Sequence, residues 1–239
     1  MEIAIVMAAG MGTRLRPVTE ATPKPLLQVA GSPMIETIIR GLLYRGVETI
    51  YIVTGYLKEQ FAYLPRKYKA VTLLHNPDFS CANNISSLYY ACDVMNQAEG
   101  FICEADLYVA DGRIFAAKLQ ESCYFGTWLE AATDDWVLDL DADGYIARIG
   151  RGGCRCFAMA GISYFKRAEM QRLAELIRRA YEEDGQTALF WDEVVNQNLS
   201  QLKLRVHSVQ KEQIVEVDTV EEWQQANAAF SRGAINEWM

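Results

Sequence analysis

The sequence predicts an α/β fold, a mostly parallel β-sheet flanked by helices, with a small β-rich elaboration. Short apolar runs alternate with segments of helical periodicity along the first half of the chain, as parallel βαβ units require. The first run, Ile3 to Met7, is apolar throughout, which is typical of a central strand buried on both faces. Residues from about 122 to 165 instead hold three segments of strand character, with an Asp-Gly turn among them.

The elements after the first strand follow from periodicity and from residues that end helices. Apolar side chains from Ile35 to Leu43 recur at helical spacing, and Gly46 ends that helix. Pro65 kinks or ends the helical segment that follows the second strand. The expected elements up to residue 106 are strands at 3–7, 49–54, 71–75 and 101–103, and helices at 35–43, 58–68 and from Asn83 or Asn84 towards Met95.

The second half of the chain is expected to return from the β-rich segment to helices. An apolar stripe from Met170 to Tyr181 predicts a long helix, which Gly185 stops. No linker, internal repeat or low-complexity segment interrupts the chain, so we predict one domain over residues 1–239. The remaining expected elements are a helix at 188–198, a strand at 204–209 and a helix from Val220.

The chain is acidic, with 31 Asp and Glu against 23 Lys and Arg and a net charge of −8. Nucleic acids and anionic membranes attract proteins through broad basic patches, so neither is an expected partner. No apolar stretch approaches the roughly 18 residues of a membrane helix, and no signal peptide is recognised. We therefore expect a cytoplasmic protein without membrane insertion, and the sequence carries no signal for an oligomeric state.

Cysteine and histidine form no catalytic or metal-binding motif in this sequence. The six cysteines match no zinc-knuckle spacing, and Cys154 and Cys156 form C-x-C rather than C-x-x-C, so free thiols are expected. The two histidines, His75 and His207, lie far apart along the chain. This composition argues against zinc-dependent hydrolysis and against Ser-His or Cys-His nucleophilic catalysis.

The stretch AAGMGTRLRPVTEATPKPL, residues 8–26, gathers glycines and cations directly after the first strand. Glycines at such a turn let backbone N–H groups approach phosphate oxygens. A dinucleotide fingerprint would need a third glycine where Leu15 stands, which disfavours a nicotinamide-dependent oxidoreductase. A Walker A loop would need Gly-Lys-Ser or Gly-Lys-Thr, which is absent. The loop suits an anionic ligand without matching either of these two nucleotide-binding patterns.

The same stretch reads A-A-G-x-G-x-R-L-x-P-x-T-x-x-x-P-K-P-L, and it resembles the signature of the sugar-phosphate nucleotidyltransferases of the pyrophosphorylase type. The resemblance implies a Rossmann-like, GT-A-like fold in which this loop wraps a nucleoside triphosphate. It also implies an enzyme that transfers a nucleotidyl group to a phosphate-bearing acceptor.

Individual residues of this stretch have expected roles. The planar guanidinium of Arg14 is suited to clamp the β- and γ-phosphates. Lys24, between two prolines, resembles the family lysine that reaches the α-phosphate and the incoming acceptor, where it would stabilise charge during transfer. Lys24 and Arg14 are therefore the expected catalytic residues. The expected triphosphate contacts are Ala8, Ala9, Gly10, Gly12, Thr13 and Arg14.

Two aspartates are expected to bind a divalent cation. Mg²⁺ prefers carboxylate and phosphate oxygens, and nucleotidyl transfer needs such an ion to neutralise the triphosphate. Asp106 follows the strand FICEAD, at the edge where open sheets bind ligands, and corresponds to a metal-ligating aspartate of the family. The segment IVEVDTVEEW resembles the family's late strand and supplies Asp218. Glu104, two residues before Asp106, is expected to be less favourably aimed.

Further segments resemble a narrower branch, the bacterial phosphocholine cytidylyltransferases. This resemblance implies CTP as the nucleotide, with residues 1–106 as the CTP-binding half and 107–239 as the half that binds the acceptor and adds the second metal ligand. It also implies base contacts from Gln28, Asn84 and Ser86. The segments that carry the resemblance are GYLKEQFAYL at 55–64, NNISSLYYA at 83–91, DDWVLDLD at 134–141, LFWDEVV at 189–195 and VEVDTVEEW at 215–223.

The acceptor site is expected to combine aromatic rings with acids. A quaternary ammonium donates no conventional hydrogen bond, so aromatic faces and nearby carboxylates bind it, and this favours phosphocholine as the acceptor. The 2-aminoethylphosphonate cytidylyltransferases look very similar, and their primary amine needs hydrogen-bond acceptors, which the same residues also offer. The expected acceptor contacts are Trp136, Phe190, Trp191, Asp192 and Glu216.

These features predict a Mg²⁺-dependent enzyme that converts CTP and phosphocholine to CDP-choline and pyrophosphate by in-line attack, without a covalent enzyme intermediate. Activity on 2-aminoethylphosphonate is the main alternative. A sugar-1-phosphate nucleotidyltransferase and a non-catalytic nucleotide-binding module are weaker alternatives. The resemblance further implies that the product would supply choline for a bacterial cell-surface polymer.

Overall fold

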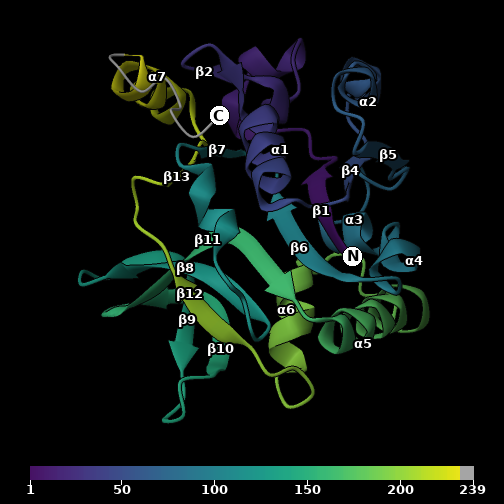
Figure 1. The fold of residues 1–239 in the computed structure, drawn as a ribbon, viewed down its shortest axis with the longest axis vertical. Coiled ribbons are helices and arrows are strands. Elements are labelled where there is room, and N and C mark those ends of the chain that lie inside the picture. The colour runs from purple at the N-terminus through teal and green to yellow at the C-terminus, as the bar shows by residue number, and fades with distance from the viewer. Residues whose placement is uncertain (232–239) are drawn as a thin grey trace.

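A nine-stranded β-sheet runs through the centre of the computed structural model, which describes residues 1–231 (Figure 1). One half of the sheet is parallel, so the carboxyl ends of its strands meet at the same edge, where open α/β sheets bind their ligands. In spatial order, these parallel strands are β6 (Glu99–Glu104), β1 (Glu2–Ala8), β4 (Thr49–Thr54) and β5 (Val71–His75).

Side chains of β1 alternate between two hydrophobic cores, one on each face of the sheet. Ala4 and Val6 pack in the core that includes helix α1 (Met34–Arg45). Ile5 lies between them in sequence and packs in the opposite core, with helix α5 (Arg167–Arg178). All three β1 side chains are fully buried, which explains why this strand is apolar throughout rather than alternating.

The β-rich segment extends the main sheet instead of forming a separate layer. Strand β11 (Cys156–Phe165) pairs antiparallel with β6 and so joins the two halves. Its pairing with β8 shifts register between Met159 and Ser163, around Gly161, whose φ of 68° few other residues adopt. The other strands of this half are β8 (Cys123–Leu129), β9 (Thr133–Leu140), β10 (Ile146–Gly153) and β12 (Arg205–Ser208).

Helices cover both faces of the parallel half (Figure 1). Helix α1 packs on one face, and residues of four helices share the core on the other face. A π-helix, Arg179–Glu183, directly follows α5. The helices of the second face are α3 (Ile85–Tyr89), α4 (Cys92–Met95), α5 and α6 (Trp191–Gln197), while α2 (Leu64–Lys67) lies beside β5. The 3₁₀ segments are Thr13–Leu15, Val18–Glu20, Lys24–Leu26, Lys58–Phe61 and Gly112–Ala116.

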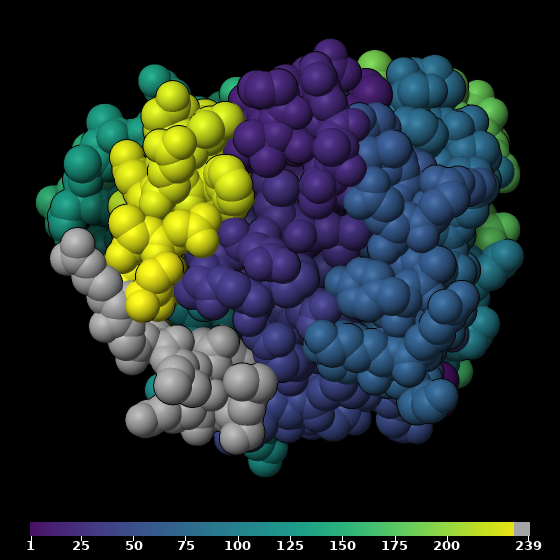
Figure 2. All heavy atoms as spheres, turned by 90° about the horizontal axis from the view of Figure 1, so that it is seen from above, coloured from purple at the N-terminus to yellow at the C-terminus, as the bar shows by residue number. Residues whose placement is uncertain are grey.

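Two small strand pairs and the last helix complete the described chain. Strands β7 (Leu107–Val109) and β13 (Ile214–Glu216) pair antiparallel outside the main sheet. Helix α7 (Val220–Phe230) packs against the N-terminal segment, as Figure 2 shows from above. Its Trp223 indole nitrogen donates to the carbonyl oxygen of Gln28 at 2.8 Å. The second small pair is β2 (Gln28–Val29) with β3 (Ser32–Pro33).

The predicted fold class is confirmed, and the differences concern element boundaries. The helices expected at 58–68 and from 83 towards Met95 are each divided into two short pieces. Pro65 lies in the first turn of α2, directly after Leu64, instead of ending a longer helix, because proline lacks an N–H group and fits that turn. Strand β7, with three residues, is not predicted by the sequence because its pairing with β13 is entirely long-range.

Two further expectations concern cysteines and membranes. All six cysteines are free thiols, as expected. None of the helices within the described residues 1–231 has the length and apolarity that crossing a membrane requires.

A buried carboxylate links α1 to the segment around α2. Glu36 accepts hydrogen bonds from Lys67 Nζ at 2.6 Å, from the Tyr68 hydroxyl at 2.6 Å and from the Tyr63 hydroxyl at 2.9 Å. Burial acts to raise the pKa of Glu36, but these three donors outweigh burial and hold the pKa below its usual value. The charged form of Glu36 therefore stabilises the native state.

We expect Glu36→Gln to lower the free energy of unfolding by roughly 1–3 kcal/mol at pH 7, because buried donors lose a charged acceptor. A lowered native pKa stabilises the fold above the unfolded value of 4.5, and this contribution disappears as the pH falls through the native pKa. Urea denaturation at pH 7 and in acid measures both effects. Exposed Glu59→Gln is the control, and an equal loss for both variants would contradict the role of Glu36.

Candidate active site

A cleft of about 660 Å³ opens at the carboxyl edge of the parallel strands. A smaller hollow of about 240 Å³ continues it beneath the loop after β1. The two share Gly10, Arg14, Asp106 and Asp218, so they form one continuous site. This volume and position suit a nucleotide together with a second small ligand.

Gly12 shapes the loop that follows β1. Its φ of 60° is left-handed, and a Cβ at this position would lie 2.9 Å from the Cβ of Lys24. The Thr19 hydroxyl donates to the Gly12 carbonyl oxygen at 2.8 Å, and Leu15 is fully buried below. At Gly10, by contrast, a Cβ would meet no atom within 4 Å, since this glycine faces the open cleft. The loop is thus folded around Lys24 and exposes its backbone to the cleft.

Lys24 is the most enclosed cation of the site, with a side chain only 9% exposed. Its ammonium donates to Asp106 Oδ2 at 2.7 Å and to Asp218 Oδ1 at 2.6 Å. Arg14 donates to the same Asp218 oxygen at 2.7 Å from the exposed rim. Burial acts to lower the pKa of Lys24, but the two carboxylates outweigh it and raise the pKa, so the ammonium remains charged.

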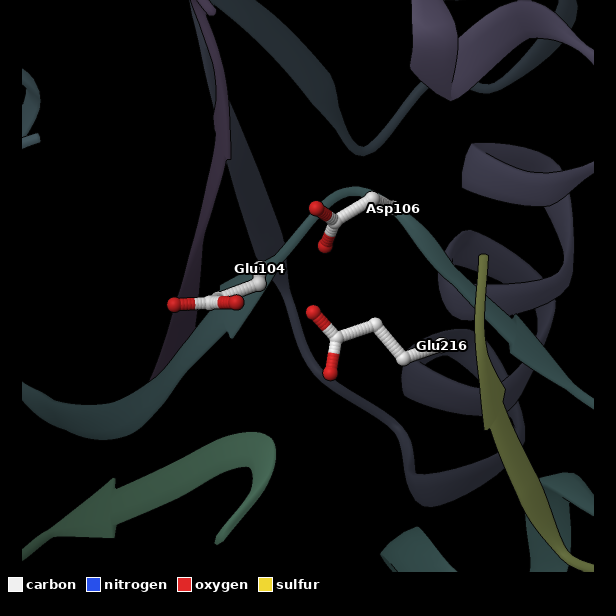
Figure 3. Close-up of side chains that lie close together, drawn as sticks. All are labelled: Glu104, Asp106 and Glu216. Atoms are coloured by element: carbon white, nitrogen blue, oxygen red, sulfur yellow. The ribbon is translucent and has the colours of Figure 1, made fainter. Parts of the chain in front are cut away.

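Three carboxylates that line the cleft lie close together, as Figure 3 shows, and one of them, Asp106, belongs to this ion pair. Glu104 ends β6, Asp106 lies in the turn after it, and Glu216 ends β13, with one oxygen of each within 4.8 Å of the others. Burial, reinforced by the charges of Asp106 and Asp218, raises the pKa of Glu216 to about 8. Burial also raises the pKa of Glu104 well above its usual value, and Asp106 adds to this effect. Such mutual repulsion is relieved by a cation.

The chemistry of these residues fits a magnesium ion. All donors are hard carboxylate oxygens, and Asp106 Oδ1 is buried without a hydrogen-bond partner. Asp106 and Asp218, the two metal ligands expected from the sequence, both accept from Lys24, but the tight cluster consists of Glu104, Asp106 and Glu216. From the sequence, Glu216 was expected at the acceptor site, but this side chain also belongs to the acidic cluster. Glu104 lies in the same cluster, although it was expected to be less favourably aimed.

The opposite end of the cleft is lined by aromatic and acidic side chains. Trp136 and Phe190 pack edge to face there, with ring centroids 5.6 Å apart. Asp192 also lines the cleft, is only 3% exposed and accepts a hydrogen bond from the Tyr124 hydroxyl at 3.0 Å. Burial raises the pKa of Asp192 to about 7. These three residues lie together as the sequence predicted.

Trp191 differs from the expectation that it contacts an acceptor. It is only 3% exposed and stacks on Tyr124 with centroids 5.6 Å apart, inside the core below the cleft. Its backbone N–H donates to Asn84 Oδ1 at 2.9 Å, which fixes the start of α6. Consecutive residues at a helix start point in different directions, so Asp192 reaches the cleft while Trp191 does not. The sequence alone could not assign these faces.

The wall opposite the acids comes from the segment between β5 and α3. Asn84 and Ser86, which are expected from the sequence to contact the base, line it. Gln28 does not line the cleft, because it lies in β2 beneath α7. The structure adds Asn76, whose side chain donates to the Ser86 and Ser87 hydroxyls at 2.9 and 3.2 Å. The other cleft-lining residues that the sequence did not single out as site residues are Met7, Phe79, Ala82, Asn83, Ser87, Ala105, Asp135, Arg151, Ala158, Met159 and Gly161.

Position along a strand could have identified part of this wall. Asn76 directly follows β5, and the residue after a parallel strand lies at the ligand-binding edge. Arg151 had no such signal, since it reaches the cleft only through the pairing of β10 with β9.

The chain belongs to the nucleotidyl transferase family, whose sequence model matches residues 3–122. A 2-aminoethylphosphonate cytidylyltransferase of Lancefieldella rimae is 50% identical over 97% of this chain and 93% of that protein. A choline-phosphate cytidylyltransferase of Streptococcus pneumoniae is 35% identical over 92% of this chain and 94% of that protein. The solved CTP:phosphocholine cytidylyltransferase from Streptococcus pneumoniae aligns with a TM-score of 0.88 at 33% identity, covering 96% of this chain and 100% of that one. The family expected from the loop after β1 is thereby confirmed.

Alanine substitutions at the two loop glycines, Gly10 and Gly12, should affect stability and nucleotide binding differently. Gly12→Ala should lower the free energy of unfolding by about 1–3 kcal/mol, because a left-handed alanine also presses on Lys24. Gly10→Ala should change stability by less than roughly 0.5 kcal/mol. It should nonetheless weaken CTP binding by on the order of tenfold or more, since the methyl group enters the cleft. Thermal unfolding and calorimetric titration of CTP measure both, and a destabilised Gly10→Ala would refute this division of roles.

Proposed function

We propose that the protein is a cytidylyltransferase that converts CTP and 2-aminoethylphosphonate to CMP-2-aminoethylphosphonate and pyrophosphate. The observation that carries the proposal is the polarity of the cleft. The loop with Lys24 and Arg14 supplies cations for an anionic group, and carboxylates with few open aromatic faces line the rest of the cleft. A short acceptor with an anionic head and an ammonium tail matches this polarity.

The choice between the two acceptors rests on hydrogen-bond chemistry. A primary ammonium has three N–H donors and suits carboxylates such as Asp192 and Glu216, whereas a trimethylammonium needs ring faces. Of the three aromatic residues expected around a quaternary ammonium, Trp191 is buried in the core, which leaves Trp136 and Phe190. This balance favours the primary amine over phosphocholine, the acceptor that the sequence alone favoured.

The relatives support the same preference. The Lancefieldella rimae protein, named for 2-aminoethylphosphonate, shares 50% of its residues with this chain, against 35% for the choline-phosphate protein of Streptococcus pneumoniae. Both names specify cytidylyl transfer, which supports CTP as the nucleotide. Phosphocholine is the second candidate acceptor, since the Trp136 and Phe190 rings still line the cleft.

The proposed reaction needs no general base. A phosphonate oxygen of the acceptor, already ionised, attacks the α-phosphorus of CTP in line, and the bond from that phosphorus to the pyrophosphate oxygen breaks as its electrons pass to pyrophosphate. Lys24, held between Asp106 and Asp218, is the cation expected to stabilise the charge on the transferred group. Arg14 and the backbone around Gly10 are expected to hold the departing phosphates.

The carboxylates are expected to hold Mg²⁺, with Asp106 and Asp218 as the principal ligands and Glu216 and Glu104 close enough to take part. When bound, the ion would supply charge neutralisation for the triphosphate. The chain itself orients the ligands, because Glu104 and Glu216 end β6 and β13, which bring both side chains close to Asp106.

The first test is pyrophosphate release from CTP and Mg²⁺ with each acceptor at equal concentration. We expect kcat/KM for 2-aminoethylphosphonate to exceed that for phosphocholine by about tenfold or more, because unmatched polar groups penalise the wrong acceptor. Glucose 1-phosphate with dTTP or UTP is the negative control. Faster turnover of phosphocholine would reverse the acceptor assignment, and no pyrophosphate with either acceptor would overturn it.

Asp106→Asn should lower kcat/KM by about 100-fold or more and raise the Mg²⁺ concentration needed for half-maximal rate, because one anionic ligand is lost. Asp134→Asn is the matched control, since Asp134 is exposed on β9 and does not line the cleft. EDTA should abolish wild-type turnover and Mg²⁺ should restore it. Wild-type rates and Mg²⁺ dependence in Asp106→Asn would remove this residue from the proposed metal site.

A further inference from the structure

Arg151 lies beside Trp136, the largest aromatic side chain that lines the cleft. Strand β10 pairs with β9 so that Arg151 stands directly opposite Trp136. The guanidinium carbon of Arg151 lies over the Trp136 ring, 5.7 Å from its centroid. Both residues line the main cleft, together with Phe190 and Asp192. Arg151 therefore acts on the end of the cleft to which the acceptor tail is assigned, and not on the phosphate end.

The Arg151 guanidinium is not engaged elsewhere. Its side chain is exposed, and among the residues that the structure describes no hydrogen bond or ion pair reaches the guanidinium. A structural arginine would instead be paired, as Arg148 is on the same strand. Arg148 donates to Asp139 at 2.6 Å and to the Gly152 carbonyl oxygen at 2.8 Å. The contact with the Trp136 ring is thus the main interaction that positions the Arg151 head group.

We propose that Arg151 is a specificity-determining residue that excludes quaternary-ammonium acceptors by covering the face of Trp136. This inference rests on the proposed cytidylyltransferase function and names the residue that sets its acceptor class. The guanidinium lies within cation–π range over the indole ring, where a trimethylammonium would have to approach the same ring. Phe190 packs edge to face against the same indole, so the ring is contacted by both neighbours.

The effect of Arg151 differs between the two acceptors for a chemical reason. A trimethylammonium has no N–H donor, so losing the ring face removes its main source of affinity and leaves like-charge repulsion from the guanidinium. A primary ammonium donates to Asp192 and Glu216 and does not depend on the ring. Repulsion from Arg151 is better offset for the primary ammonium, because its N–H groups can approach cleft carboxylates at hydrogen-bond distance, whereas methyl groups keep a quaternary ammonium farther away.

The test compares Arg151→Met with Arg151→Lys and Arg151→Gln, measuring kcat/KM for both acceptors at saturating CTP and Mg²⁺. Methionine keeps an unbranched side chain but removes the guanidinium and its charge, so the ratio of phosphocholine to 2-aminoethylphosphonate turnover should rise by about tenfold. Glutamine should raise the same ratio, and lysine should do so less, since it keeps the charge. Arg155→Met, on an exposed side chain outside the cleft, should keep the wild-type ratio.

The outcomes separate this inference from the proposed function. If the wild type prefers 2-aminoethylphosphonate and the ratio is the same in Arg151→Met and Arg151→Gln, Arg151 does not set specificity, although the proposed function stands. If the wild type uses neither acceptor, the proposed function fails, and the inference fails with it. A wild type that prefers phosphocholine would show directly that Arg151 does not exclude the quaternary ammonium. The KM for CTP, measured in each variant, reports whether the nucleotide end of the cleft has changed.

Discussion

The ammonium group of Lys24, held between Asp106 and Asp218, is the interaction on which the rest of the site depends. It joins three segments that are distant in sequence: the loop after β1, the turn after β6 and the junction of β13 with α7. Without this cation, two carboxylates would face each other in a largely enclosed position, where repulsion is poorly screened. The small β7–β13 pair positions the two acids, because Asp106 directly precedes β7 and Asp218 follows two residues after β13.

This arrangement sets how positive and negative charges are distributed in the cleft. The N-terminal loop contributes cations and backbone N–H groups, while β6 and β13 contribute acids whose pKa values are raised by burial and by one another. A chain with a net charge of −8 therefore brings Lys24 and Arg14 together where phosphates are expected to lie, while Arg151 lies beside Trp136. The acids are themselves a reason to expect a divalent cation, because it relieves the repulsion that Lys24 only partly offsets.

Selectivity between an acceptor with a primary amine and one with a quaternary amine depends on only a few groups in the cleft. Both relatives named above are cytidylyltransferases by name. The features of the cleft that would distinguish a primary from a quaternary amine are its exposed ring faces and its available carboxylates. Trp191 contributes to the core and Trp136 has a guanidinium over its ring, so the aromatic content of the sequence overstates the aromatic surface of the cleft. Packing, rather than composition, determines what an acceptor would meet.

The sequence by itself determined the family, the α/β fold and the loop around Gly12 and Lys24, because these depend on local spacing and on strands whose apolar pattern is unambiguous. It also indicated Asp106, through its position at a strand end. Only the tertiary structure decided that Trp191 is buried, that Gln28 lies outside the cleft and that Glu104 and Glu216 converge on Asp106. It alone brought Arg151 over Trp136. Helix faces and strand register fix these placements, and both are set by long-range packing that no local pattern encodes.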